Sequence, residues 1–212
     1  MAKKVSKIQQ AQLAVVMSDP VLWARHFLIT NNALTKKMGP WEARDYQEEM
    51  MRDTSLKKVY RCGRRIGKSE TMIVEALHKA FTHNLYRVLF VTPYENQVNL
   101  VFMRMKELIE QSPLVKAQVV TFKSSPYTVE FKNGSKILGF TTGAASGSGA
   151  ASVRGQRADW IFMDEIDYMG AEDYSTISAI AGERPDIGMT ASSTPTGKRG
   201  TFYRMCTDPS FG

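Results

Sequence analysis

Apolar side chains recur at helical spacing in two long segments and form short continuous runs between them. Residues 95–111 predict an amphipathic helix, because one face carries Val98, Val101, Phe102, Met105, Leu108 and Ile109. A second helix is predicted from Lys68 onward, with Ile73, Leu77, Ala80 and Phe81 on one face. The apolar runs at 87–91 and 160–163 are typical of strands that are covered on both faces.

The remaining pattern completes an alternation of strands and helices. Further strands are predicted at 57–61, 119–122, 128–131, 136–140 and 188–193, with an Asn133-Gly134 hairpin turn. Helices are predicted at 4–17, 21–29, 43–52 and 171–181, and loops at 31–40 and 141–152. This order favours an α/β fold with a mainly parallel central sheet, a helical N-terminal segment at 1–56 and a core at 57–212.

Composition narrows the class of protein only slightly. The 212 residues are 43% hydrophobic and 23% charged, as in globular proteins. There is no apolar run long enough for a bilayer and no signal peptide after the polar start, which favours the cytoplasm and no membrane partner. Cys62 and Cys206 lack metal-binding spacing, so we interpret them as reduced thiols. The net charge of +7 favours a polyanion such as nucleic acid, although weakly by itself.

A phosphate-binding loop is predicted between the strand at 57–61 and the helix that begins at Lys68. Backbone N–H groups at the start of a helix face an anion, and the helix dipole favours it. The nucleotide-binding residues are then Gly63, Arg64, Arg65, Ile66, Gly67, Lys68 and Ser69. Lys68 would reach the β- and γ-phosphates of ATP, and the Ser69 hydroxyl would bind Mg²⁺. Cys62 stands where such loops usually have their first glycine, so a chance Gly-Lys-Ser sequence is the alternative.

Two carboxylates follow the apolar strand at 160–163. Neighbouring strand residues point to opposite faces, so Asp164 and Glu165 should have different roles. We assign Asp164 to Mg²⁺, through water, and Glu165 to the general base that activates the attacking water. The alternative is a solvated acidic turn. The phosphate loop upstream favours the functional interpretation.

Together these residues resemble the large subunit of tailed-phage terminases over nearly the whole chain. Residues 18–25 resemble the N-terminal segment of that family, and Trp41 with Tyr46 and Gln47 resembles its adenine-side element. Arg64 resembles the arginine of the family's deviant phosphate loop, where it would sense the γ-phosphate. Residues 192–197 resemble its coupling motif, which implies that Ser193 and Thr194 relay nucleotide state.

The resemblance also implies a shared active site. Arg154 lies in a segment that resembles the one carrying a trans-acting arginine finger, which completes the site of a neighbouring subunit in a ring. Arginine suits this role because it stays charged and can bridge phosphate oxygens. An ordinary surface ion pair is the alternative for Arg154.

The implied fold is a P-loop NTPase of the RecA/ASCE-like kind, and the implied function is an ATP-hydrolysing motor. It would move double-stranded DNA into a procapsid in the host cytoplasm, as a homo-oligomeric ring on the portal protein, together with the small terminase subunit. Family members usually continue into an RNase H-like nuclease domain. We expect no nuclease activity from these 212 residues.

Two other functions remain open from the sequence. Residues 164–167 have the DExD form of superfamily-two helicases, and 192–194 resemble their coupling triplet, although such enzymes need a second RecA-like domain. A non-enzymatic, nucleotide-gated DNA-binding assembly module is the other alternative, and the presence of Glu165 disfavours it. Lys198 and Arg199 fit a DNA-backbone contact or a solvated turn equally well.

Overall fold

A mixed sheet forms the centre of the molecule. The computed structural model describes residues 6–31, 36–143, 153–182 and 184–208. Within them one sheet has seven strands in the order β3-β9-β8-β4-β7-β6-β5. Neighbouring strands from β3 to β7 in this order are parallel, whereas β6 is antiparallel to β7 and β5 is antiparallel to β6. The strands are β3 (Lys57–Arg61), β4 (Arg87–Thr92), β5 (Val119–Ser124), β6 (Tyr127–Phe131), β7 (Lys136–Thr141), β8 (Trp160–Asp164) and β9 (Gly188–Ser193). The predicted α/β fold is therefore confirmed.

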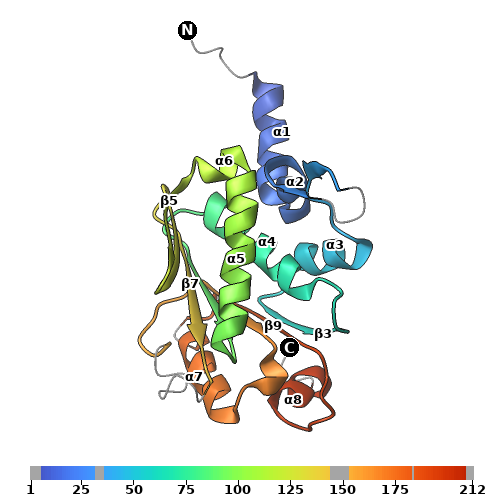
Figure 1. Cartoon of the computed structure of the whole chain (residues 1–212), viewed down its shortest axis with the longest axis vertical. Coiled ribbons are helices and arrows are strands. Elements are labelled where there is room, and N and C mark those ends of the chain that lie inside the picture. The colour runs from blue at the N-terminus through green and yellow to red at the C-terminus, as the bar shows by residue number, and fades with distance from the viewer. Residues whose placement is uncertain (1–5, 32–35, 144–152, 183, 209–212) are drawn as a thin grey trace.

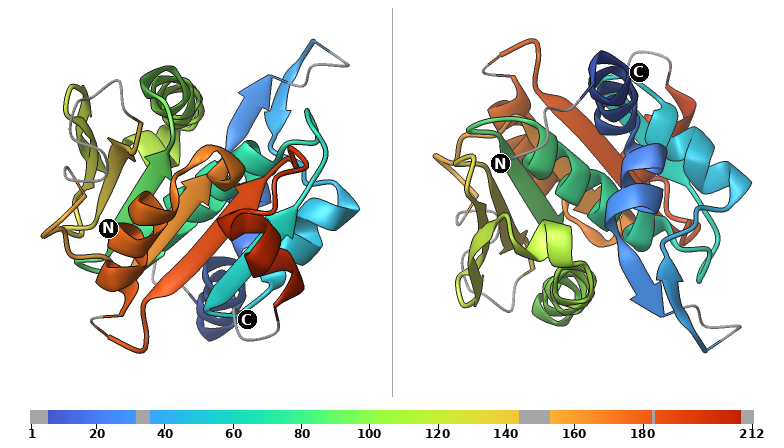
Figure 2. Two further views of the ribbon diagram at one scale, coloured as in Figure 1. Left: turned by 90° about the horizontal axis from the view of Figure 1, so that it is seen from below. Right: turned by 90° about the horizontal axis from the view of Figure 1, so that it is seen from above.

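Helices cover both faces of this sheet (Figures 1 and 2). One face packs against α4 (Lys68–Thr82) and α5 (Glu95–Gln111), and the other against α7 (Ala171–Ala181) and α8 (Thr201–Thr207). Strand alternation explains the division, because Val88 and Phe90 join the first core while Leu89 and Val91 join the second. None of the described helices is long and apolar enough to cross a membrane.

The N-terminal segment contributes three helices, α1 (Lys7–Ser18), α2 (Pro20–Phe27) and α3 (Asp45–Arg52). Asp19 begins α2, because its carboxylate accepts hydrogen bonds from the N–H groups of Val21 and Leu22 at 2.8 and 3.0 Å. Trp23 of α2 is fully buried against α4. Trp23 meets His78 and Phe81, so this packing joins the segment to the C-terminal part of α4.

The structure differs from the predicted elements in several short places. The antiparallel strands β1 (Ile29–Asn31) and β2 (Met38–Pro40) lie where the end of the helix at 21–29 and the ends of the loop at 31–40 were predicted. A short helix α6 (Pro113–Lys116), a 3-10 turn η3 (Ile166–Tyr168) and α8 were not predicted. Elements of three to seven residues are too short to show a hydrophobic period, and tertiary contacts decide them. Most of the small-residue loop predicted at 141–152 lies outside the described residues.

His78 of α4 is buried. Its Nε2 lies 2.9 Å from the carbonyl oxygen of Met17, and its ring meets Trp23 edge-on at 5.5 Å. Burial lowers the pKa of His78 from 6.5 to about 4. The fold therefore holds the neutral imidazole, whose Nε2–H donates a hydrogen bond to the carbonyl oxygen of Met17.

We expect acid to destabilise the fold through this histidine. Because the folded pKa lies below the unfolded value, the contribution is complete above pH 6.5 and is lost as the pH falls toward about 4. The loss should amount to about 3 kcal/mol. Urea unfolding at several pH values should show that His78→Gln removes this part of the acid sensitivity. His83→Gln, at an exposed position, should leave it. Equal acid sensitivity in wild type and His78→Gln would contradict this assignment.

Candidate active site

The segment between β3 and α4 forms a loop whose end is fixed by backbone geometry. Gly67 caps α4 with a φ of +91°, in the left-handed region that favours glycine. A Cβ at Gly67 would lie 2.8 Å from Nε2 of Gln47, so a side chain there would displace the Gln47 amide. The first N–H groups of α4 have no partners within the helix. The loop is thus suited to an anion such as phosphate.

The carboxyl ends of the parallel strands meet at one edge of the sheet, and the predicted residues meet there too. Because β9 lies between β3 and β8, the phosphate loop, the hydroxyl-bearing end of β9 and the acidic pair are consecutive along this edge. Nζ of Lys68 lies 2.5 Å from Oε1 of Glu165 and 3.4 Å from Oγ1 of Thr194. The hydroxyl of Ser69 donates a hydrogen bond to Asp164.

Asp164 is nearly inaccessible to solvent. Its Oδ1 accepts hydrogen bonds from the hydroxyl of Ser192 at 2.8 Å and from the N–H of Glu165 at 3.0 Å. Burial raises the pKa of Asp164, although the hydrogen bonds from Ser69 and Ser192 oppose the shift. A buried carboxylate beside a hydroxyl is a hard oxygen donor set. The described residues contain no cluster of three or more His, Cys, Asp or Glu side chains that could hold a metal ion without other ligands. This small donor set suits Mg²⁺, which keeps several waters and takes phosphate oxygens as further ligands.

Glu165 stands outside the strand, which corrects the reason given for separating the two carboxylates. Its φ of +56° is left-handed, so strand alternation does not orient it. The two side chains nevertheless have different partners. Asp164 is bonded to Ser69, whereas Glu165 pairs with Lys68 and accepts a hydrogen bond from Ser193 at 3.3 Å.

Tyr46 and Gln47 both contact the phosphate loop from α3. The hydroxyl of Tyr46 donates to the carbonyl of Ile66. The amide of Gln47 donates to the carbonyl of Gly67 at 3.3 Å and to the Thr71 hydroxyl at 3.0 Å. A cavity of about 370 Å³ lies beside them, lined by Thr30, Asn31, Pro40, Trp41, Glu42, Arg44, Gln47, Arg65, Gly67, Glu70 and Arg104. These contacts support the loop, and adenine recognition by Gln47 stays a prediction.

The two predicted arginines lie differently. Arg64, in the loop, has a guanidinium nitrogen 3.5 Å from the hydroxyl of Tyr168 in η3. Arg154 is exposed, as is Gly155 after it, whereas Val153 before it is buried. No hydrogen bond or ion pair among the described residues joins Arg154 to the loop or to the acidic pair of its own chain.

Three side chains near the site had no individual role predicted from the sequence, although Ser192 and Asp167 lie in the motifs at 192–197 and 164–167. Ser192 bonds Asp164, and the turn after β9 is held by Asp167, which accepts hydrogen bonds from the N–H and hydroxyl of Thr196 at 2.8 and 2.5 Å. A run of hydroxyl residues at the end of a buried strand was an available signal for Ser192. Gln97, in the first turn of α5, lines a cavity with Asp164 and Glu165. No sequence motif marked Gln97, because its position depends on how α5 packs.

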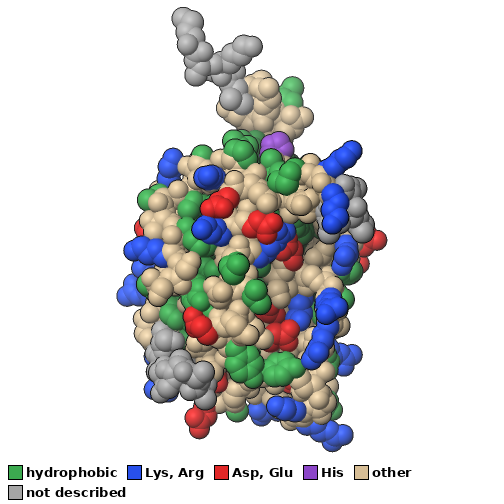
Figure 3. Space-filling model, in the orientation of Figure 1, with side chains coloured by type: hydrophobic (Ala, Val, Ile, Leu, Met, Phe, Trp, Pro, Cys, Tyr) green, Lys and Arg blue, Asp and Glu red, His purple; other side chains and the backbone are tan. Residues whose placement is uncertain are grey.

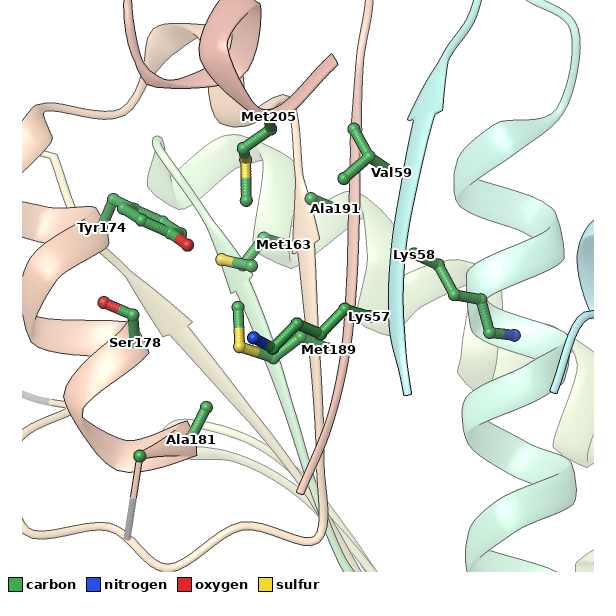
Figure 4. Close-up of a pocket in the computed structure, with 11 residues that line it drawn as sticks. Lys57, Lys58, Val59, Met163, Tyr174, Ser178, Ala181, Met189, Ala191 and Met205 are labelled. Atoms are coloured by element: carbon green, nitrogen blue, oxygen red, sulfur yellow. The ribbon is translucent and has the colours of Figure 1, made fainter. Parts of the chain in front are cut away.

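A separate apolar cavity of about 270 Å³ lies on the other face of the sheet (Figure 4). Its lining includes Met163, Met189 and Met205, with Tyr174 and Ser178 from α7. Lys57 points toward it, whereas Lys58 points away to the opposite face, where it pairs with Glu75 at 2.9 Å. No phosphate-loop residue lines this cavity. This cavity is therefore separate from the phosphate loop.

A phosphate loop that faces a buried carboxylate across one intervening strand, at the edge of a mainly parallel sheet, defines a P-loop nucleotide hydrolase. The family model of the "Terminase large subunit, T4likevirus-type, N-terminal" region matches residues 59–210. The chain belongs to this family and is the ATPase motor domain of a viral DNA-packaging terminase. No curated protein matches the sequence.

Solved structures share the fold. The Thermus phage P74-26 large terminase ATPase domain matches with 22% identity and a TM-score of 0.66, over 78% of this chain and 69% of that one. The HK97 bacteriophage large terminase matches with 12% identity and a TM-score of 0.76, over 92% of this chain and 41% of that one. The UvsW helicase of bacteriophage T4 matches with 11% identity and a TM-score of 0.56, over 94% of this chain and 64% of that one. The family match decides between terminase and helicase, because the fold is common to both.

Proposed function

We propose that ATP binds with Mg²⁺ at the strand edge and is hydrolysed there, with the energy used to move double-stranded DNA. The observation that carries the proposal is the convergence of Lys68 and Ser69, at the start of α4, with Asp164 and Glu165, at the end of β8. A cation, a hydroxyl and two carboxylates within hydrogen-bonding reach are the groups that phosphoryl transfer to water requires.

Ser69 and Asp164 would hold Mg²⁺, the latter through water. The metal, when bound, neutralises charge on the β- and γ-phosphates. The raised pKa of Asp164 fits this assignment, because a buried carboxylate is more readily kept ionised beside a cation. The phosphate groups would lie on the N–H groups of Gly63, Arg64, Arg65, Ile66 and Gly67.

The adenosine would occupy the cavity beside Trp41 and Arg44. Gln47 lines this cavity and is already bonded to the phosphate loop, while Tyr46 contacts the loop at Ile66. The segment 1–56 is thereby part of the motor domain, with residues 57–212 as its ATPase core. Binding of the base in this cavity would affect the phosphate loop through these same hydrogen bonds.

Hydrolysis needs Lys68 to exchange partners. Lys68 is paired with Glu165 at 2.5 Å, and phosphate would draw its ammonium group away. Glu165 is then free to accept a proton from the attacking water. Arg64 would sense the γ-phosphate in cis, and Arg154 of a neighbouring copy would stabilise the negative charge that develops.

Ser193 and Thr194 are suited to report the nucleotide state, since both contact the Lys68–Glu165 pair. The hydroxyl of Ser193 also accepts a hydrogen bond from the N–H of Asp167. The carboxylate of Asp167 in turn accepts a hydrogen bond from the N–H of Thr196, in the turn that leads to Lys198 and Arg199. Lys and Arg side chains gather along the right margin of the molecule down to α8 (Figure 3). With the net charge of +7, they support binding to the DNA backbone.

The remaining partners follow from the family. The motor would act in the host cytoplasm as a ring of identical subunits on the portal protein of the procapsid, with the small terminase subunit. It needs no membrane. DNA held through its phosphates should be bound with strong salt dependence and little sequence preference.

The direct test is ATP binding by Lys68→Ala. Loss of a charged hydrogen-bond donor to phosphate should weaken ATP affinity by roughly 10- to 100-fold, measured by equilibrium titration with a fluorescent ATP analogue. Lys57→Ala removes an exposed lysine at the other end of β3, away from the phosphate loop, and should bind ATP as wild type does. Wild-type affinity and hydrolysis in Lys68→Ala would overturn the proposed site.

A further inference from the structure

The cavity next to the acidic pair has a wall that belongs to α5. Its volume is about 240 Å³, and Ser69, Asp164 and Glu165 line it together with Gln97 and Arg104. The sheet register explains the proximity. Because Val91 pairs with Met163, β4 ends beside the start of the acidic turn, and α5 begins a few residues later.

The packing of α5 fixes the direction in which Gln97 points. Val98 and Val101 are buried in the core on one side of the helix. Arg104, two turns after Gln97, is held by Glu70 through hydrogen bonds of 2.7 and 2.8 Å. The helix therefore cannot rotate without breaking this ion pair and exposing apolar side chains. Gln97 is kept in the wall of the cavity.

The amide of Gln97 has hydrogen-bonding capacity that the described residues do not use. Its Oε1 atom is inaccessible to solvent and has no hydrogen-bond partner among the described residues, so this oxygen can meet a water once the amide turns toward the cavity, a turn that breaks no hydrogen bond of Oε1. Buried polar atoms are nearly always paired, and an exception at a cavity with reactive groups points to a ligand or a catalytic role. The other polar groups of this wall, Glu70 and Arg104, satisfy each other.

We propose that Gln97 orients the water that attacks the γ-phosphate. The inference rests on the proposed function and adds a residue to it. The amide oxygen can accept a hydrogen bond from one O–H of the water while Glu165 accepts a hydrogen bond from the other, so that a lone pair of the water faces phosphorus. The oxygen–phosphorus bond forms as the bond to the bridging oxygen breaks. Its electron pair stays on ADP, and the proton passes to Glu165.

A neutral amide suits this wall better than a further charge. The cavity is already lined by the carboxylates of Glu70, Asp164 and Glu165, with Arg104 as the cation. Another carboxylate would repel the γ-phosphate, and a lysine would pair with Glu165 and compete with the water. Glutamine supplies both a donor and an acceptor without changing the charge.

Two substitutions separate orientation of water from filling of space. Gln97→Met keeps nearly the same length and volume but has no amide, whereas Gln97→Ala removes both. We expect single-turnover hydrolysis to fall by about 100-fold in both variants, with ATP affinity within twofold of wild type. Asn96→Ala, at the exposed neighbouring position of α5, should hydrolyse ATP at the wild-type rate.

Each outcome decides the role of Gln97. If Gln97→Met hydrolyses ATP as fast as wild type and only Gln97→Ala is slow, Gln97 fills space and the proposal is overturned. If both lose hydrolysis and also lose ATP affinity, Gln97 supports binding, which equally overturns it. Lys68→Ala is measured alongside. Full activity in that variant would overturn the proposed ATP site itself, and with it the proposed role of Gln97.

Discussion

Glu165→Gln is expected to lower the rate of ATP hydrolysis by about 1000-fold while ATP still binds. The amide keeps the size and hydrogen-bonding reach of the side chain but cannot take the proton of the attacking water. The partners of Glu165 predict a second effect. Its Oε1 lies 2.5 Å from Nζ of Lys68, in a pair that competes with phosphate for the lysine. Removing the negative charge frees Lys68, so the ATP dissociation constant should fall.

The two readouts come from separate experiments. Single-turnover assays give the chemical step, and equilibrium titration with labelled ATP gives the affinity. Glu172→Gln is the matched control, because it makes the same change at an exposed position in the first turn of α7. A rate for Glu165→Gln close to that of wild type would exclude Glu165 as the base. Weaker ATP binding would exclude competition for Lys68.

Arg154→Ala is expected to abolish the part of the activity that depends on assembly. A trans-acting arginine contributes about 1000-fold or more to the rate of nucleotide hydrolysis. Arg154 is suited to reach a neighbour, because it is exposed while Val153 beside it is anchored in the core. The specific activity of wild type should therefore rise with protein concentration. That of Arg154→Ala should stay low and flat.

Mixing two inactive variants tests whether the arginine acts in trans. Arg154→Ala subunits keep a complete site, and Glu165→Gln subunits keep the arginine. Activity should return in the mixture if a finger from one copy serves the site of the next. Arg157→Ala, another exposed arginine three residues further on, should behave as wild type. No recovery on mixing, together with a concentration-independent wild-type rate, would argue for a site that works in a single subunit.

Much of the fold could be predicted because its long elements carry regular hydrophobic periods. The helix at 95–111 was predicted with the bounds that α5 has, and the buried strands at 87–91 and 160–163 came within one residue of β4 and β8. Short elements were missed. The pairing of β1 with β2, and the turn η3, depend on contacts between residues that carry no periodic signal.

The sequence also predicted four side chains that the structure brings together, Lys68, Ser69, Asp164 and Glu165, because each lies at or just after the end of a predicted strand. Their partners were not readable. The placement of β9 between β3 and β8 brings Ser192 to Asp164 and Ser193 to Glu165, and that order comes only from sheet assembly. The left-handed backbone of Glu165 is a further example, because it cancels the strand alternation on which the sequence argument relied.

The sequence by itself determined the class of fold, the phosphate loop and the pair of carboxylates, because local spacing and strand-to-helix order encode them. Tertiary structure decided which side chains those groups meet. It pairs Lys68 with Glu165, places Gln47 beneath Gly67, buries His78 and turns Gln97 toward the acidic pair. These contacts join residues far apart in the chain, and only the packing of helices on a common sheet sets their distances.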